Sequence, residues 1–274
     1  MHPVTAVTPI LAGEVRIKRT QRYGRGPVGV RHLRTMVSRQ WLSPRPIYCW
    51  LIDHPDGPIL VDTGPRPTSD WSYPRYHPFY PLAYRTRVNE QAGLLSGLGE
   101  ADLSPDDLEC IILTHCHPDH AEGLAEVPDV PVVMSADEYR YAGSLRGRFW
   151  GAHPSLTPER ERARLVDLDD GSIGPFERSH EVVSGVSLVP TPGHTAHHCS
   201  VIIQGEGPPV MLAADAIYDV DQLDSGRADG VATRVRAGRR SVELVDLWHR
   251  SSDGVVLPSH DPAGPDRLAS ERRS

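Results

Sequence analysis

One short run of the chain gathers most of its candidate metal ligands. Residues 114–120 read Thr-His-Cys-His-Pro-Asp-His, which places three imidazoles and one carboxylate within six positions. Such groups are costly to bury unless they are paired or bind a metal. In an extended segment His115 and His117 project to the same side, and a turn after the proline would bring Asp119 and His120 to the same point. Nitrogen and oxygen donors of this kind predict a site for zinc or a neighbouring transition metal.

Three further candidate ligands follow at wide intervals, and each comes after a hydrophobic run that predicts a strand. They are His194, Asp215 and His260, after the runs at 186–189, 210–214 and 254–259. With the first cluster they make five imidazoles and two carboxylates. A catalytic zinc usually takes three protein ligands and leaves a position for water. Seven donors are therefore enough for two metal ions with one shared carboxylate.

Taken singly, the three later donors have ordinary interpretations as well. His194 could be a loop histidine, Asp215 a helix N-cap, and His260 part of a Ser-His-Asp-Pro turn. The other nine histidines are expected to be solvated or satisfied by local hydrogen bonds, not to bind metal. That expectation includes His197 and His198, although they lie close to His194.

The elements that must position these donors can be placed from hydrophobic patterns and capping residues. The run 110–113 predicts a buried strand that delivers the first cluster to its carboxyl end. The runs 46–52 and 58–61, joined through His-Pro-Asp-Gly, predict a hairpin. Apolar residues at 242, 244, 245 and 248 form one helical face. Further helix starts are predicted at Ser104-Pro105, Ser135 and Thr157-Pro158.

Length and charge limit the possible classes. The chain has 274 residues, and its 26 prolines and 24 glycines are scattered without forming a linker, so we expect a single domain over residues 1–274. The formal net charge is −7 and the pI is about 6.0, which argues against a nucleic-acid partner. The arginine-rich run 234–240 is expected to be a solvated loop.

The cysteines and the hydropathy of the chain indicate the cellular compartment in which the protein is found. The four cysteines, at 49, 110, 116 and 199, include no C-x-x-C pair, which fits a reduced cytoplasmic protein. Cys116 is expected to point away from the metal ions. The amino terminus shows no signal pattern and no apolar run approaches 18 residues, so we expect neither secretion nor a membrane partner.

The spacing of the donors resembles the metallo-β-lactamase superfamily, whose signature is H-x-H-x-D-H followed by separate His, Asp and His ligands. The resemblance implies an α+β fold, a four-layer αββα sandwich with two similar halves. It also implies two divalent metal ions, with zinc favoured and manganese, cobalt or iron as alternatives. The first ion would be bound by His115, His117 and His194, the second by Asp119, His120 and His260, with Asp215 shared. The Val61–Gly64 segment also matches, and Asp62 would orient a ligand histidine; the alternative is a turn aspartate.

Within that superfamily the chain is most similar to the N-acyl-homoserine lactonases, the quorum-quenching lactonases. The similar segments are 48–64, 191–200 with its Thr-Pro-Gly-His-Thr, and 215–218, where Tyr218 lies three residues after the shared aspartate. The similarity runs from about residue 45 to about residue 262, and segments 14–45 and 65–90 depart from it. It implies a metallo-hydrolase, a carboxylic ester hydrolase, that opens a lactone ring by attack of a hydroxide held between two metals.

In that reaction Asp119 would move a proton and Tyr218 would donate to the oxyanion, although Tyr218 could also be a packing aromatic. The substrate would be a small-molecule lactone and the protein a monomer or homodimer. Alternative readings are another lactone, ester or thioester substrate, as in glyoxalase II, or a metal-binding protein without hydrolytic activity. The aromatic and proline-rich segment 71–81 would form a pocket wall, a dimer contact or a loop packed on itself.

Overall fold

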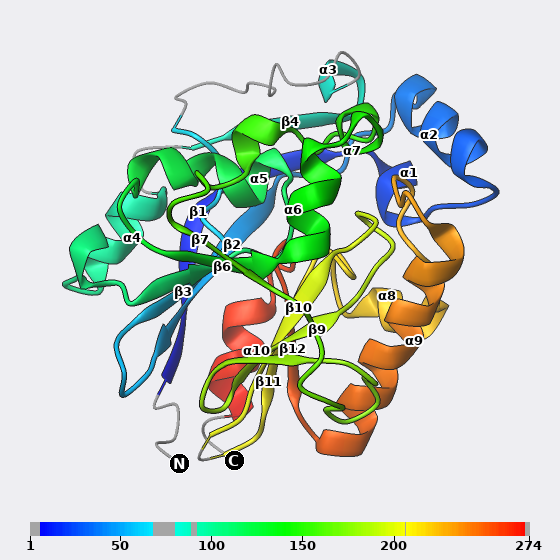
Figure 1. Ribbon diagram of the computed structural model, residues 1–274. Helices are drawn as coiled ribbons and strands as arrows, with labels where there is room; N and C mark the ends of the chain where they lie inside the picture. The colour runs from blue at the N-terminus through cyan, green and yellow to red at the C-terminus, as the bar shows by residue number, and fades with distance from the viewer. Residues whose placement is uncertain (1–5, 68–79, 89–91, 206, 272–274) are drawn as a thin grey trace. The chain divides into compact units, whose positions relative to one another are not determined.

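The computed structural model describes residues 6–67, 80–88, 92–205 and 207–271 (Figure 1). The chain divides into two compact units, and each holds its own sheet. We call them the seven-stranded unit, residues 6–17 and 42–166, and the five-stranded unit, whose described residues are 18–41, 167–205 and 207–271. Neither unit is continuous in sequence, so no single cut in the chain separates them.

The sheet of the seven-stranded unit is mixed, with strand order β4-β1-β2-β3-β5-β6-β7. Neighbours from β4 to β3 pair antiparallel, whereas β3, β5, β6 and β7 run parallel. The strands are β1 (Ala6–Ile17), β2 (Arg45–Asp53), β3 (Ile59–Val61), β4 (Tyr84–Arg87), β5 (Cys110–Ile112), β6 (Val132–Ser135) and β7 (Ala163–Val166).

Short helices connect these strands, and α4 contacts β1 while α6 contacts β6 and β7 (Figure 1). The helices are α3 (Tyr80–Ala83), α4 (Leu94–Glu100), η1 (Pro105–Asp107), α5 (Pro118–Ala121), η2 (Glu122–Glu126), α6 (Ala136–Gly143), α7 (Leu145–Phe149) and η3 (Pro154–Leu156). The hydrophobic run 110–112 is fully buried, as expected for a strand with neighbours on both sides. The predicted strand that precedes the histidine cluster is thereby confirmed.

The other predictions for this unit have mixed outcomes. The hairpin is confirmed as β2 and β3, and Ser135 caps α6 by accepting a hydrogen bond from the Asp137 N–H at 3.2 Å. The start at Ser104 leads only to the three residues of η1. The start at Thr157 is wrong, because the Arg162 and Ala163 N–H groups donate to the Glu159 carbonyl in a tight turn that feeds directly into β7.

The sheet of the five-stranded unit has the order β12-β11-β10-β9-β8, and only β11 and β12 are parallel. Its strands are β8 (His180–Val183), β9 (Val186–Pro190), β10 (Cys199–Ile203), β11 (Val210–Ala214) and β12 (Val255–Pro258). Its helices are α1 (Arg19–Arg22), α2 (Val28–Val37), α8 (Asp221–Ser225), α9 (Val235–Ser252) and α10 (Gly264–Glu271). Both units thus mix helices with a mixed sheet, which confirms the α+β class.

The core of the five-stranded unit forms between α9 and its sheet. Val242, Val245 and Trp248 of α9 pack with Met211 of β11 and Val256 of β12, all of them buried. The helical face predicted from residues 242–248 is confirmed. Burial of apolar surface at about 25 cal/mol per Å² is the main term that holds this helix on the sheet.

The amino end of α9 corrects one prediction. The run 234–240 is not a loop, because residues from Val235 onward are helical. The helix lies very close to the loop that follows β9. A Cβ added to Gly193 of that loop would lie 2.2 Å from the Gly238 Cα. The Ser241 hydroxyl donates to the Pro192 carbonyl at 2.7 Å and fixes the same contact. The arginines at 234, 236, 239 and 240 remain exposed, as expected for charged side chains on a helix surface.

Three smaller expectations concern the cysteines, membrane-spanning helices and the aromatic and proline-rich segment. All four cysteines lie within the described residues, are buried, and carry thiols. Among the described residues no helix is both long and apolar enough to cross a bilayer. Residues 68–79, which include most of the aromatic and proline-rich segment, lie outside the described residues.

Candidate metal centre

The histidine cluster of the seven-stranded unit lies between the end of β5 and the start of α5. Residues 113–117 continue β5 in extended form, and α5 begins at the proline that follows. The ring centroids of His115 and His117 are 4.8 Å apart, and those of His115 and His120 are 4.2 Å apart. Asp119 and His120 lie on the first turn of α5, with the His120 Nε2 3.9 Å from the Asp119 carboxylate. The structure therefore gathers all four polar residues of the motif.

Asp62 holds this cluster from the loop after β3. Its Oδ2 lies 2.7 Å from the His120 Nδ1, and its carboxylate also accepts the Thr114 N–H at 2.9 Å and the Thr114 hydroxyl. The residue is buried and has a φ of +61°, a conformation that aspartate tolerates better than most residues. Because Nδ1 is engaged by the carboxylate, the His120 Nε2 is the nitrogen oriented for a metal. The role of Asp62 in orienting a metal ligand stays a prediction.

A second buried carboxylate supports the same loop and was missed from the sequence. Glu138 of α6 is fully buried, and its Oε1 accepts the Cys116 N–H at 3.2 Å, between His115 and His117. Burial raises the pKa of the Cys116 thiol well above its ordinary value, and the carboxylates of Glu138 and Asp62 add to the shift. The Cys116 side chain is fully buried, as is usual for an unpaired cysteine. In the sequence Glu138 stands three residues after the predicted helix start at Ser135, a spacing that indicates only a helix cap.

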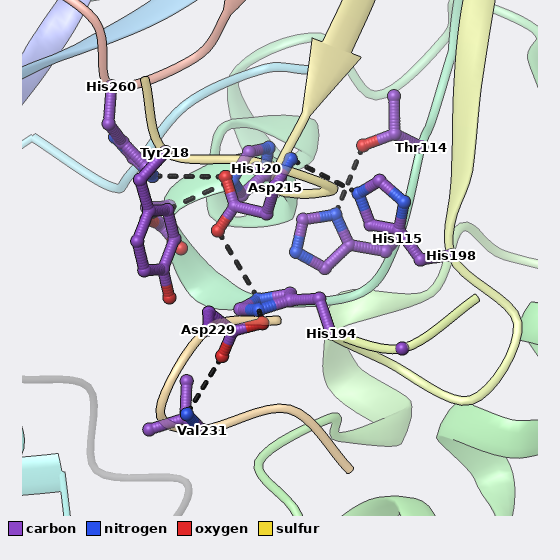
Figure 2. Close-up of polar contacts among 12 residues, drawn as sticks. Thr114, His115, His120, His194, His198, Asp215, Tyr218, Asp229, Val231 and His260 are labelled. Atoms are coloured by element: carbon purple, nitrogen blue, oxygen red, sulfur yellow. Dashed lines mark hydrogen bonds and ion pairs between the residues drawn. The ribbon is translucent and has the colours of Figure 1, made fainter. Parts of the chain in front are cut away.

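The donors of the five-stranded unit meet around Asp215, as Figure 2 shows. The Asp215 Oδ2 lies 3.2 Å from the His194 Nε2, and its Oδ1 lies 3.2 Å from the His260 Nε2. All three side chains are buried. One carboxylate therefore presents a different oxygen to each of two imidazoles, which is the geometry expected of an aspartate shared by two metal ions.

Each of these donors follows a strand end, as the sequence indicates. Asp215 comes directly after β11, whose last residue, Ala214, has a φ of +45°. His260 follows β12, where the Ser259 N–H donates to the Ala214 carbonyl at 3.4 Å. His194 lies in the loop after β9, which is bent by a hydrogen bond from the Gly193 N–H to the Thr195 carbonyl at 2.8 Å. The parallel pair of β11 and β12 thus brings Asp215 and His260 together.

A buried aspartate outside every predicted motif contacts His194 from the other side. The Asp229 carboxylate lies 3.5 Å from the His194 Nδ1, and its Oδ1 accepts the Val231 N–H at 2.8 Å (Figure 2). The buried guanidinium of Arg31 donates to the backbone carbonyls of Ala228 and Asp229 and so holds this loop. The loop is therefore held by a buried cation, and it places the Asp229 carboxylate opposite the His194 Nδ1. Its sequence, Ala-Asp-Gly, gives only a turn signal.

Tyr218 packs against both histidines of this unit. Its ring centroid is 5.9 Å from that of His194 and 5.7 Å from that of His260, in edge-to-face arrangements. The side chain is buried, and its backbone N–H donates to the Gln222 Oε1 at 3.0 Å. Figure 2 shows the phenol extending along the Asp215 side of the cluster. The packing contact is thus present, and the hydroxyl remains a candidate donor.

The donor chemistry and spacing fit zinc. Two ligands that bind one tetrahedral zinc at 2.0–2.1 Å lie about 3.3 Å apart. The two nitrogen–oxygen distances around Asp215 are both 3.2 Å, longer than the usual charge-assisted hydrogen bond of about 2.8 Å. In the seven-stranded unit, one ligand atom of His115 and one of His117 lie within 4.8 Å of each other. Each unit therefore contributes histidine and aspartate groups that could hold a metal ion.

Comparison with known proteins places the chain in a family. Residues 42–260 match the model of the Metallo-beta-lactamase superfamily. An N-acyl homoserine lactonase from Bacillus sp is 29% identical over 182 residues, which cover 66% of this chain and 67% of that protein. A probable metallo-hydrolase from Mycobacterium tuberculosis is 29% identical over 263 residues, which cover 86% of this chain and 81% of that protein.

A solved structure shows the same fold. An N-acyl homoserine lactone hydrolase, with the product N-hexanoyl-L-homoserine bound at its catalytic metal centre, superposes with a TM-score of 0.69 and 22% identity. The match covers 99% of this chain and 97% of that one. The α+β class and the metallo-β-lactamase fold expected from the sequence are confirmed by the family match and by this likeness.

Proposed function

The chain belongs to the metallo-β-lactamase superfamily and is a metallo-hydrolase of that superfamily, and we propose that it opens lactone rings, with N-acyl-homoserine lactones as substrates. The observation that carries the proposal is Asp215, which presents one carboxylate oxygen to His194 and the other to His260. An aspartate placed to offer one oxygen to each of two metal ions is consistent with a two-metal hydrolytic site.

The metal assignment is the one that membership of the superfamily implies. His115, His117 and His194 would bind one ion, and Asp119, His120 and His260 would bind the other, with Asp215 shared. The family match spans residues 42–260, so it contains every one of these seven donors. Zinc is the proposed metal, because imidazole and carboxylate ligands with tetrahedral spacing suit it best.

The ions would supply Lewis acidity at the lactone carbonyl and lower the pKa of a bound water to about 7. The chain's own residues have separate tasks. Asp62 and Asp229 hold the rings of His120 and His194, so that those ligands need no reorganisation during the reaction. Asp119 would take the proton released by the attacking water and return it to the leaving alkoxide. Tyr218 would donate its hydroxyl proton in a hydrogen bond to the carbonyl oxygen as negative charge develops there.

Two observations favour a lactone over a glutathione thioester. The related Bacillus protein is named an N-acyl homoserine lactonase, and it has 29% identity to this chain. The first basic residue after His260 is Arg267, and its guanidinium is already engaged, donating to the Asp261 carboxylate at 2.8 Å and to the Val256 carbonyl at 2.9 Å. It is therefore not available to bind the carboxylates of a glutathione moiety. The four buried thiols fit a cytoplasmic location for this activity.

The proposal is tested by adding zinc-loaded protein to a panel of N-acyl-homoserine lactones, other lactones and glutathione thioesters. Ring opening releases acid, so a pH indicator in weak buffer follows the lactones, and thiol release follows the thioesters. A His117→Ala protein is the blank. We expect rapid opening of the homoserine lactones that the blank lacks. Thioester cleavage without lactone opening would move the assignment to a thioesterase.

A further inference from the structure

A chain of buried hydrogen bonds runs behind Asp215, entirely within the five-stranded unit. The Asp215 N–H donates to the His198 Nε2 at 3.2 Å, and the His198 Nδ1 lies 2.9 Å from the Thr191 hydroxyl. That hydroxyl lies 2.8 Å from the Ser200 hydroxyl, which donates to the Ala213 carbonyl at 3.2 Å. The side chains of Thr191, His198 and Ser200 are all fully buried, so water does not compete for these groups.

The two ends of the chain fix the direction of every bond in it. A backbone N–H can only donate, and a backbone carbonyl can only accept. The His198 Nε2 must therefore carry no proton, and the ring's proton must sit on Nδ1, where it donates to Thr191. Thr191 then donates to Ser200, and Ser200 donates to Ala213. The network specifies a single tautomer of a neutral imidazole, the Nδ1–H form.

Both ends lie on the same short piece of backbone. Ala213 and Asp215 flank Ala214, whose φ of +45° is unusual for a residue with a Cβ. The register between β11 and β12 shifts at this position, so ordinary strand pairing does not continue through it. Backbone in this region is strained for a residue other than glycine and persists only where its surroundings hold it. The side chains of His198 and Ser200 bind one group on each side of the bend.

We propose that His198 is a positioning residue for Asp215, and that its Nδ1–H tautomer, held by Thr191 and Ser200, fixes the bend that aims the Asp215 carboxylate. The inference rests on the proposed function, in which Asp215 is the ligand shared by two ions. Loss of the acceptor at Nε2 would release the Asp215 N–H and let the carboxylate rotate away from its position between His194 and His260. An outer partner of this kind typically changes metal affinity by roughly 10- to 100-fold.

The tautomer can be observed directly in the zinc-loaded protein. Nitrogen-15 NMR of labelled histidine distinguishes protonated from bare ring nitrogens, and the His198 signals are those that disappear in a His198→Gln variant. We expect a protonated Nδ1 and a bare Nε2. A His198 ring protonated at Nε2 could not accept from Asp215 and would overturn the proposal.

Two variants distinguish the effect of the hydrogen-bond acceptor at the Nε2 position from the effect of the imidazole ring itself. In His198→Gln the side-chain carbonyl reaches the place of Nε2 and can accept from Asp215, whereas in His198→Asn it is too short to do so. Zinc affinity is measured by chelator competition, and the cobalt-substituted protein gives an absorption spectrum that reports ligand geometry. We expect roughly 10- to 100-fold weaker zinc binding and an altered cobalt spectrum in His198→Asn, with most of the affinity restored in His198→Gln.

Two further variants complete the test. His197→Asn, the same change at the neighbouring position, is expected to keep wild-type zinc affinity. Thr191→Val removes the hydroxyl at nearly constant volume and is expected to shift the His198 tautomer and weaken zinc binding. A folded His198→Asn protein with wild-type affinity and spectrum would overturn the inference. If His198→Asn does not fold, the inference is tested by the wild-type tautomer and by the zinc affinity of His198→Gln. A ring protonated at Nε2 in the wild type, or zinc binding in His198→Gln that is far weaker than in the wild type, would overturn it.

The control for the proposed function is Asp215→Ala. If it keeps full affinity for two zinc ions, the shared-ligand assignment itself fails. If it loses zinc while His198→Asn does not, only the positioning role of His198 fails.

Discussion

Asp62 Oδ2 lies 2.7 Å from His120 Nδ1, and both side chains are buried. A buried carboxylate that accepts from one ring nitrogen raises the basicity of the other, so this contact strengthens the His120 Nε2 as a ligand. We expect Asp62→Asn to weaken zinc binding by roughly 10- to 100-fold, as measured by chelator competition. Asparagine tolerates the positive φ of this position, so the variant should fold with an unchanged circular dichroism spectrum. Unchanged zinc affinity would show that Asp62 only closes a turn.

Asp229 is expected to hold the orientation of His194. The change Asp229→Asn keeps an oxygen for the Val231 N–H but removes the charge that faces the His194 Nδ1 at 3.5 Å. We expect zinc affinity to fall about tenfold with little change in thermal stability. Asp224→Asn, at an exposed acid on α8, is the matched control and should have no effect. If Asp229→Asn loses thermal stability but keeps its zinc affinity, Asp229 stabilises the loop and does not orient His194.

Tyr218 is expected to act on the transition state and not on the metal. Removing one hydrogen-bond donor to a developing oxyanion typically lowers kcat by about 10²-fold. We therefore expect Tyr218→Phe to lose kcat on homoserine lactones while keeping wild-type zinc affinity, since the phenol is not among the proposed ligands. Tyr139→Phe on α6 serves as the control. Full activity in Tyr218→Phe would show that Tyr218 acts only through its packing contacts with His194 and His260.

The buried thiols predict a stability that falls at alkaline pH. Burial raises the pKa of Cys110 from 9.0 to about 11. Between these values the folded protein keeps the thiol proton and the unfolded chain releases it, so the free energy of unfolding decreases as pH rises through this window. Urea unfolding of the wild type should therefore lose more stability from pH 9 to about 11 than Cys110→Ala does. An identical loss in both proteins would contradict the assignment.

The positions of the strands and the main ligands could be predicted because hydrophobic runs precede polar residues in a regular way. Buried strands such as β5 and β11 have apolar side chains on both faces, and their carboxyl ends deliver His115 and Asp215. The helix face at Val242 was predictable for the same reason. The start at Thr157 was not, because a Thr-Pro pair favours a turn and a helix alike, and pairing with β6 decides between them.

The residues that hold the ligands could not be found in this way. Asp229, Glu138 and His198 contact the site through tertiary folding, and their local sequences indicate only a turn, a helix cap and a satisfied histidine. Their proposed roles depend on single contacts, a 3.5 Å charge contact with the His194 ring and hydrogen bonds from the Cys116 N–H and the Asp215 N–H, which no sequence period encodes. The segment 234–240 is a further case, because close packing of Gly238 on Gly193 decides that this charged run is helical.

We propose that this chain opens lactones with two metal ions. The most direct measurement is the rate of N-acyl-homoserine lactone opening as zinc is titrated into the metal-free protein. We predict that the rate of the metal-free protein is at background, rises with added zinc and levels off at two equivalents per chain. Opening that persists after chelation, or that stays at background with two zinc ions bound, would contradict it.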